Sequence, residues 1–337
     1  MEPEQVILPD ASQAPWLAPP CEQLRQARRA GRFPTGLLIH DERGAGGEAM
    51  VRFASQLALC REVDAPCGRC RDCRQWLASQ HPDFIRVAPL EESKYIRVEQ
   101  IRELSEALSL TAHGGGATVA VLQPADSLNV NAANALLKTL EEPRGGVTLL
   151  LLCSEPSRLP ATIVSRCQRM RIRPPSREES IAWLERLKGS GPWAAVLDVL
   201  GNAPYEALQV DAAGLAQLKG ETDRVLEEAV AGHLEVAQTA ERWGAKSAPF
   251  EWRLACIETW ITSRIDRAVR QGGDRQEMRN SSHLSESHSD MNIAYLLRVL
   301  DGAYELRRLR LTSINRSLAL EQLLWQLTRA SRANKAA

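Results

Sequence analysis

The sequence has no uninterrupted apolar run of about 18 residues or more, although apolar residues make up 44% of its 337 positions. A transmembrane helix is therefore not expected. The first ten residues are acidic, contain Pro3 and Pro9, and lack the basic start and apolar core of a secretory signal. These absences predict a cytoplasmic protein with no membrane contact.

The chain also lacks an excess of charge of either sign. Lys and Arg together number 42, as do Asp and Glu, so the formal net charge is zero. Aromatic residues are only 5% and form no stripe interleaved with basic residues. A protein whose main task is to neutralise a long run of phosphates is therefore not expected. Apolar residues at 44% with charged residues at 25% are typical of a globular protein, which excludes disorder of the whole chain.

The eight cysteines are spread unevenly, and four of them lie within a short segment in a C-x6-C-x2-C-x2-C pattern: Cys60, Cys67, Cys70 and Cys73. In a reducing compartment such clustering indicates metal ligands before disulfides. Four thiolates fill a tetrahedral zinc site and leave no open position for water. The pattern predicts a structural Zn²⁺ rather than a catalytic one. A set of buried or redox-labile cysteines is the alternative.

The first half of the chain alternates between strand and helix patterns. Residues 1–21 are rich in proline and are expected to be extended. Strands are predicted at 36–40, 83–88, 118–122 and 147–152, and helices at 48–59, 98–110 and from 130 to the residues before Pro143. This order predicts an α/β domain with a parallel sheet covered by helices on both faces.

Beyond Pro174 and Pro175 the pattern becomes helical. Ser176 and Glu179 form a capping box, and three helices are predicted near 250–271, 291–309 and 316–331. The polar segment 271–290 contains His283 and His288, for which a solvated loop is favoured over a metal site. Three domains are predicted: an α/β domain at 1–174, an all-α domain at 175–243 and a second all-α domain at 244–337.

The first strand leads into a glycine-rich turn, which is the setting of a phosphate-binding loop. Such a loop has the pattern G-x-x-x-x-G-K-[ST]. Asp41 stands at the first glycine position and Gly46 at the second, with Gly44 between them. Gly47 replaces the lysine and Glu48 replaces the hydroxyl residue. The geometry of the loop is retained, but the groups that bind phosphate and magnesium are missing.

One stretch links the chain to a known family. The segment Asn134–Pro143 reads NALLKTLEEP, and residues 162–167 read TIVSRC. This combination resembles the clamp-loader subunits of bacterial DNA polymerase III, which belong to the AAA+ superfamily. A four-cysteine insertion after the first helix is a further point of similarity. The resemblance covers essentially the whole chain and implies a RecA-like AAA+ domain with a zinc knuckle at 60–73, a helical lid and a helical collar.

Departures from the family pattern point to one type of subunit within it. The resemblance places Gln123 and Pro124 where motor subunits carry the carboxylates that serve magnesium and water. Together with Gly47 and Glu48, these losses resemble the delta-prime type, which does not hydrolyse ATP. No ATP is therefore expected on this chain. The retained Ser165-Arg166-Cys167 implies that Arg166 acts in trans as an arginine finger on the ATP of a neighbouring motor subunit.

The resemblance also implies partners: the gamma/tau motor subunits and the delta subunit, and through the complex the sliding clamp and primed DNA. Two other functions remain as alternatives. One is an ATP-binding AAA+ motor with unusual loop chemistry, and the other is a zinc-dependent nucleic-acid-binding module. The missing lysine opposes the first alternative, and the neutral charge opposes the second.

Overall fold

The computed structural model describes residues 9–42, 44–91, 93–109, 112, 116–245, 249–277, 293–309 and 315–335. The predicted histidine loop with His283 and His288 lies outside these residues. Contacts divide the chain into two compact units. Unit 1 comprises Met1–Leu187 with Asn202–Gln209, and unit 2 comprises Lys188–Gly201 with Val210–Ala337. The boundaries expected at 174/175 and 243/244 remain a prediction.

Unit 1 is built on a five-stranded parallel sheet in the order β2-β3-β4-β1-β5. The strands are β1 (Gly36–Asp41), β2 (Phe84–Val87), β3 (Thr118–Leu122), β4 (Val147–Cys153) and β5 (Gln168–Ile172). Every residue of β3 and β4 is buried. Because these strands are covered on both faces, their sequences are apolar without alternation. The predicted α/β parallel-sheet fold is confirmed.

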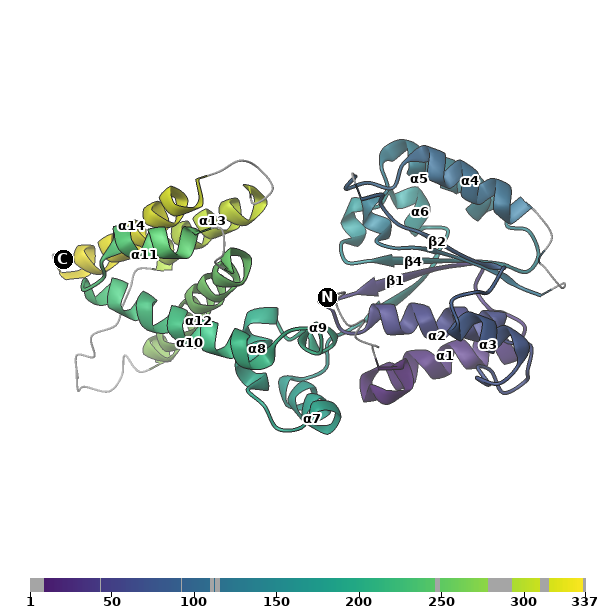
Figure 1. Ribbon diagram of the computed structural model, residues 1–337, viewed down its shortest axis with the longest axis horizontal. Helices are drawn as coiled ribbons and strands as arrows, with labels where there is room; N and C mark the ends of the chain where they lie inside the picture. The colour runs from purple at the N-terminus through teal and green to yellow at the C-terminus, as the bar shows by residue number, and fades with distance from the viewer. Residues whose placement is uncertain are drawn as a thin grey trace. The chain divides into compact units, whose positions relative to one another are not determined.

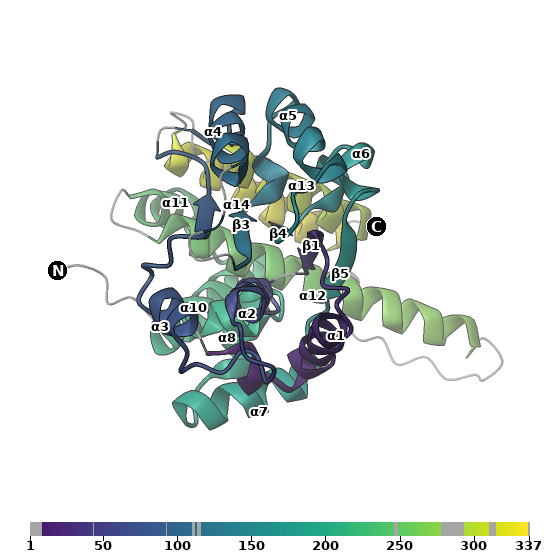
Figure 2. The same ribbon diagram turned by 90° about the vertical axis from the view of Figure 1, so that its right-hand side faces the viewer.

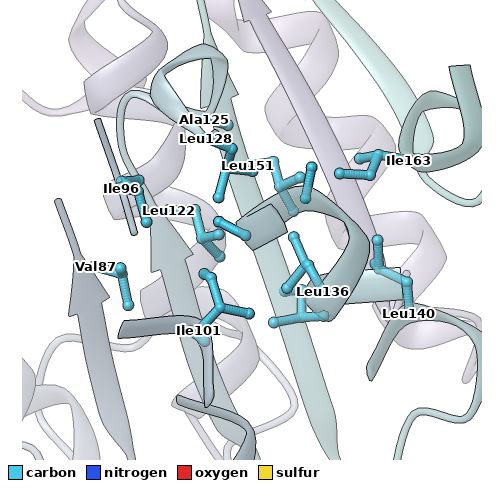
Figure 3. Close-up of a cluster of buried hydrophobic side chains, with 14 of the residues drawn as sticks. Val87, Ile96, Ile101, Leu122, Ala125, Leu128, Leu136, Leu140, Leu151 and Ile163 are labelled. Atoms are coloured by element: carbon cyan, nitrogen blue, oxygen red, sulfur yellow. The ribbon is translucent and has the colours of Figure 1, made fainter. Parts of the chain in front are cut away.

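Helices cover both faces of this sheet (Figures 1 and 2). One face carries α1 (Ala18–Arg29), α2 (Gly47–Leu59) and α3 (Arg71–Leu77), and the other carries α4 (Val98–Ser109), α5 (Val130–Glu141) and α6 (Ala161–Val164). Between the sheet and α4–α6 lies a core of aliphatic side chains (Figure 3). Ile101, Leu136 and Leu151 are each fully buried there. This core fixes the position of α5, which carries the NALLKTLEEP segment.

Two elements of unit 1 differ from expectation. The sequence predicts an extended segment over residues 1–21, of which 1–8 lie outside the described residues; in the rest, two short 3-10 turns, Ala11–Gln13 and Pro15–Leu17, lead directly into α1 at Ala18. Pro19 and Pro20 lie in the first turn of this helix, where a missing N–H breaks no intrahelical hydrogen bond. The edge strand β5 was not predicted, because only two of its five residues are buried.

Unit 1 also includes two helices from beyond the sheet, α7 (Arg177–Lys188) and α9 (Pro204–Ala207). The predicted capping box is present at the start of α7: the Glu179 N–H donates to Ser176 Oγ, and the Ser176 N–H donates to the Glu179 carboxylate. Trp183 on α7 donates its indole N–H to the Gln13 carbonyl at 2.7 Å. Segments about 170 positions apart in the sequence are thereby joined.

All the secondary structure described in unit 2 is helical, as predicted. It contains α8 (Trp193–Leu200), α10 (Ala212–Ala231), α11 (Val236–Gly244), α12 (Phe250–Glu277), α13 (Ile293–Leu309) and α14 (Arg316–Lys335). Its core gathers side chains from α10 to α14, including Trp243, Ile257 and Leu324. In Figure 1 these helices form a bundle, in which α11 packs on α14 and α12 on α13. None of the helices in the described ranges is both long and apolar enough to cross a membrane.

Candidate functional site

The four clustered cysteines come together at the end of α2 and the start of α3. Cys60 follows α2, Cys70 is the N-cap of α3, and Cys73 lies in its first turn. All four sulfur atoms lie within 4.8 Å of one another, with Cys67 Sγ to Cys73 Sγ at 3.9 Å and Cys70 Sγ to Cys60 Sγ at 4.0 Å. Sulfur atoms bound at about 2.3 Å to one tetrahedral zinc lie about 3.8 Å apart. The cluster therefore fits a zinc ion.

Backbone amides support negative charge on these sulfur atoms. The Cys70 N–H points at Cys67 Sγ at 3.3 Å, and the Cys73 N–H at Cys70 Sγ at 3.4 Å. The amides of Cys70 and Arg69 lower the pKa of Cys67 to about 6. Burial raises the pKa of Cys60 and Cys73. A bound cation would favour their deprotonated forms, because thiolates are the species that bind zinc.

The cysteine segment is tied to the sheet by a small polar network. Asp72, between two of the cysteines, forms an ion pair with Arg61, whose Nε lies 3.0 Å from one carboxylate oxygen, and its other carboxylate oxygen lies 3.6 Å from His81 Nε2. The His81 Nδ1 accepts the Asp83 N–H at 3.1 Å, just before β2. Because Nδ1 is an acceptor, a neutral His81 carries its proton on Nε2, facing Asp72. The knuckle is thus joined to the sheet as well as to α2.

The glycine-rich loop is closed by a side chain of its own. The Asp41 carboxylate, at the end of β1, accepts the Ala45 N–H at 2.8 Å, and the amides of Gly46 and Gly47 also bond to it. In a phosphate-binding loop such amides cradle phosphate. Asp41 therefore occupies the position of the anion. Burial raises the pKa of Asp41, while the three amide bonds oppose this increase.

Side chains from distant segments press on the same loop. A Cβ added at Gly46 would lie 2.5 Å from Tyr205 Cε2 and 2.9 Å from Leu17 Cδ1. The Trp16 indole N–H donates to the Ala45 carbonyl at 2.7 Å. The carboxylate of Glu206 also approaches Gly44, and its pKa is raised by burial and by the charge of Asp41. The loop is therefore covered by apolar rings and by a second carboxylate, a poor setting for triphosphate.

This packing gives a direct test of the closed loop. Gly46 has φ +115° and no space for a Cβ, so Gly46→Ala is expected to reduce the free energy of unfolding by about 3 kcal/mol or more. Gly31→Ala is the matched control, because Gly31 has φ +66° but nothing within 4 Å of its Cβ position. We expect that control to lose only about 1 kcal/mol. Urea denaturation measures both, and equal losses would contradict the tight packing.

The positions of the missing motor carboxylates lie just beyond β3. Gln123 donates its backbone N–H to the Val87 carbonyl at 3.0 Å, and Pro124 caps a short 3-10 turn. Neither residue can bind magnesium as a carboxylate does. Asp126, two residues further on, accepts the backbone N–H groups of Glu155 and Ser154 at 2.9 and 3.3 Å. This carboxylate joins the ends of β3 and β4. Glu48 lies in the first turn of α2.

Arg166 lies on an exposed turn between α6 and β5. Its Nη1 donates to the Thr162 carbonyl at 3.0 Å, and its Nη2 lies 2.6 Å from Glu141 Oε1. The Cys167 beside it is buried, and burial raises the pKa of its thiol to about 11, so it is a poor nucleophile. Ser165 Oγ donates to the Thr162 carbonyl. Cys167 and Ser165 thus contribute packing and hydrogen bonding to the turn that presents Arg166.

These predicted residues do not form one site. Asp41, Gly44, Gly46 and Gly47 gather in the closed loop, the four cysteines form a separate cluster, and Arg166 lies on a third region. The sequence did not predict that Trp16 and Tyr205 contact the glycine-rich loop. No local sequence pattern indicates a contact between residues so far apart in the chain. A short acidic residue directly before a glycine-rich turn is a signal for Asp41, because aspartate commonly accepts from nearby backbone amides.

Comparison with known proteins places the chain in a family. A family model described as "DNA polymerase III, delta subunit" matches residues 18–176. The DNA polymerase III subunit delta' of Pseudomonas aeruginosa is 32% identical over 302 residues, covering 86% of this chain and 90% of that protein. The Escherichia coli subunit delta' is 39% identical over 174 residues, covering 51% of this chain and 52% of that protein.

A relative named as a different subunit matches a shorter region. The DNA polymerase III subunit tau/gamma of Haemophilus influenzae is 32% identical over 152 residues, which is 44% of this chain and 22% of that protein. The match to the Pseudomonas aeruginosa subunit extends through both units and nearly the whole of that relative. This chain therefore belongs to the family of DNA polymerase III delta-prime subunits.

Proposed function

We propose that this chain is a clamp-loader subunit that does not hydrolyse ATP and that supplies Arg166 to the ATP site of a neighbouring gamma/tau motor subunit. The observation that carries the proposal is the closed phosphate loop in the same unit as an exposed, motif-bearing arginine. Asp41 already satisfies the amides that phosphate would need. Unit 1 can therefore supply the Arg166 guanidinium to the ATP site of a neighbouring subunit rather than act as a motor itself.

The chemistry of Arg166 suits a contribution in trans. A guanidinium is always charged and binds phosphate oxygens through a planar fork of N–H donors. About 36% of the Arg166 side chain is exposed, so an outside ligand can reach it. An arginine that enters a neighbour's site stabilises charge on the transferred phosphoryl group. The alternative of an ATP-binding motor is disfavoured by the Asp41 carboxylate and by the tight cover over Gly46.

The predicted domain at 244–337, which contains α12, α13 and α14, is proposed as the collar that joins the partner subunits. Leu320, Leu323 and Leu324 on α14 are buried within the core of unit 2. Leu318 and Trp325, seven residues apart and therefore on one face of α14, remain 62% and 43% exposed. Contacts with partner subunits would bury these side chains at about 25 cal/mol per Å² of apolar surface. The proposed partners are the gamma/tau and delta subunits, and through them the sliding clamp and primed DNA.

The zinc cluster is proposed to be structural. Cys60, Cys67, Cys70 and Cys73 would supply four thiolates and complete the coordination of the metal, so no position is left for substrate. Bound zinc would join the end of α2 to α3 and offset the charge of the thiolates. The alternative of a zinc-dependent nucleic-acid-binding module has no supporting observation among the described residues, and the net charge of the chain is zero.

One reconstitution experiment tests the proposed function. Calorimetric titration of MgATP into the isolated, zinc-loaded chain is expected to give no binding heat, while a motor subunit with a complete phosphate loop serves as the positive control. Adding the chain to gamma/tau and delta subunits is expected to raise DNA-stimulated ATP hydrolysis and to allow the clamp to be loaded on primed DNA. ATP binding by the isolated chain, or an undiminished rate when the chain is omitted, would contradict the proposal.

A further inference from the structure

The Arg166 guanidinium is held by two acceptors of its own chain. Thr162 provides a carbonyl oxygen at 3.0 Å from Nη1, and Glu141 provides a carboxylate oxygen at 2.6 Å from Nη2. A guanidinium carries five N–H donors, so the hydrogen bond to Thr162 and the ion pair with Glu141 leave at least three donors for another ligand. Arg166 can therefore bind a phosphate oxygen while it remains attached to Glu141.

The two acceptors belong to packed elements rather than to loose loops. Glu141 is the last residue of α5, and its neighbour Leu140 belongs to the apolar core. Cys167, next to Arg166, belongs to the same core. A Cβ at Gly36, the first residue of β1, would lie 3.0 Å from Leu140 Cδ2 and 3.5 Å from the Arg166 carbonyl oxygen. The end of α5 and the arginine turn thus meet at the start of β1, where a Cβ would make a tight contact with Leu140.

We propose that Glu141 is a positioning residue for Arg166, which it holds in the orientation that the neighbouring subunit's ATP requires. This inference rests on the proposed arginine-finger function. A free arginine side chain has many rotamers and loses that freedom on binding. A side chain already fixed by a carboxylate and a carbonyl oxygen loses less conformational entropy on binding. A larger share of its interaction free energy therefore stabilises the transition state.

The sign of the rate change distinguishes positioning from a simple charge effect. The Glu141 carboxylate would also repel a nearby phosphate, because both groups are negative. If repulsion dominated, removing the carboxylate would raise the rate. If positioning dominates, as we propose, removing it lowers kcat and leaves KM for ATP unchanged, because the motor subunit's own loop binds the ground-state nucleotide.

The test uses the assembled complex with Glu141→Ala and Glu141→Gln. Glu141→Ala is expected to lower kcat of DNA-stimulated ATP hydrolysis about two- to fivefold, the range of an exposed ion pair. Glu141→Gln should fall between this variant and the unmodified protein, because its amide oxygen still accepts a hydrogen bond. Glu142→Ala is the matched control, because this carboxylate lies next in sequence but lines the groove between α4 and α5. It should leave kcat unchanged.

A double variant separates positioning from a general structural effect. In an Arg166→Ala background, Glu141→Ala should cause no further loss, because a positioning residue acts only through the residue it holds. A persistent second loss, or an unchanged or increased kcat for Glu141→Ala alone, would overturn the inference. If Arg166→Ala itself leaves the rate unchanged, the proposed finger fails as well. That result is distinguishable from a failure confined to Glu141.

Discussion

Replacing Arg166 with alanine is expected to lower DNA-stimulated ATP hydrolysis by the reconstituted complex roughly tenfold or more at the site that this residue contacts. Arginine fingers contribute on the order of 10³–10⁵ in rate in GTPases, because they stabilise charge that develops only in the transition state. The fold should not change. Arg166 and Glu141 are both partly exposed, and such a pair contributes about 0.2–1 kcal/mol to stability. Size-exclusion chromatography should show an assembled complex.

Two further variants make this prediction specific to the guanidinium of Arg166. Arg166→Lys retains the positive charge but lacks the planar fork, so it should recover only part of the lost rate. Arg158→Ala removes a nearby exposed arginine that stands outside the Ser-Arg-Cys motif, and it should have the rate of the unmodified complex. An unchanged rate for Arg166→Ala, or an equal loss for Arg158→Ala, would refute the assignment.

Loss of the proposed zinc should strongly destabilise the chain. The purified chain is expected to contain one zinc per molecule, and Cys70→Ser should release it. Zinc binding to unfolded finger peptides contributes about 10–16 kcal/mol. Here the cluster belongs to a unit with its own apolar core, so we expect a smaller loss, on the order of 3 kcal/mol or more. Metal analysis and thermal denaturation measure the two effects.

Serine at position 70 isolates the contribution of the metal. Cys70 is the N-cap of α3 and its sulfur accepts the Cys73 N–H, a role that a serine hydroxyl fills well. Destabilisation of Cys70→Ser therefore reports loss of a metal ligand rather than loss of the cap. Cys256→Ala, in unit 2 and outside the cluster, should retain zinc in full. Full retention of zinc by Cys70→Ser would contradict the four-thiolate site.

Several features of unit 1 follow from local sequence. The buried strands β3 and β4 can be predicted because each is a continuous apolar run. The helix α5 can be predicted because its apolar residues recur at helical spacing on one face. The cysteine cluster is readable from spacing, because three of its members lie within seven residues and can meet around a single turn. Arg166 is marked by its motif. In each case the residues that determine the feature are neighbours in the chain.

Other features of the same unit have no local signal. The edge strand β5 buries only Met170 and Ile172, so its alternation is too short to be recognised. Pro19 and Pro20 indicate an extended segment unless they fall in the first turn of a helix, which their spacing alone does not decide. The ion pair between Glu141 and Arg166 depends on the meeting of the end of α5 and the turn with Arg166 at the start of β1. Such contacts arise only after the sheet has formed.

The phosphate loop shows most clearly which features follow from local sequence and which depend on contacts between distant segments. The amino-acid sequence alone establishes that Gly47 and Glu48 cannot provide a lysine and a hydroxyl group, because side-chain chemistry is specified residue by residue. Closure of the loop becomes visible only in the folded chain. Asp41 turns back onto the loop amides, and Tyr205 reaches Gly46 from about 160 positions away. Closure depends on packing between distant segments, and packing is a property of the folded chain.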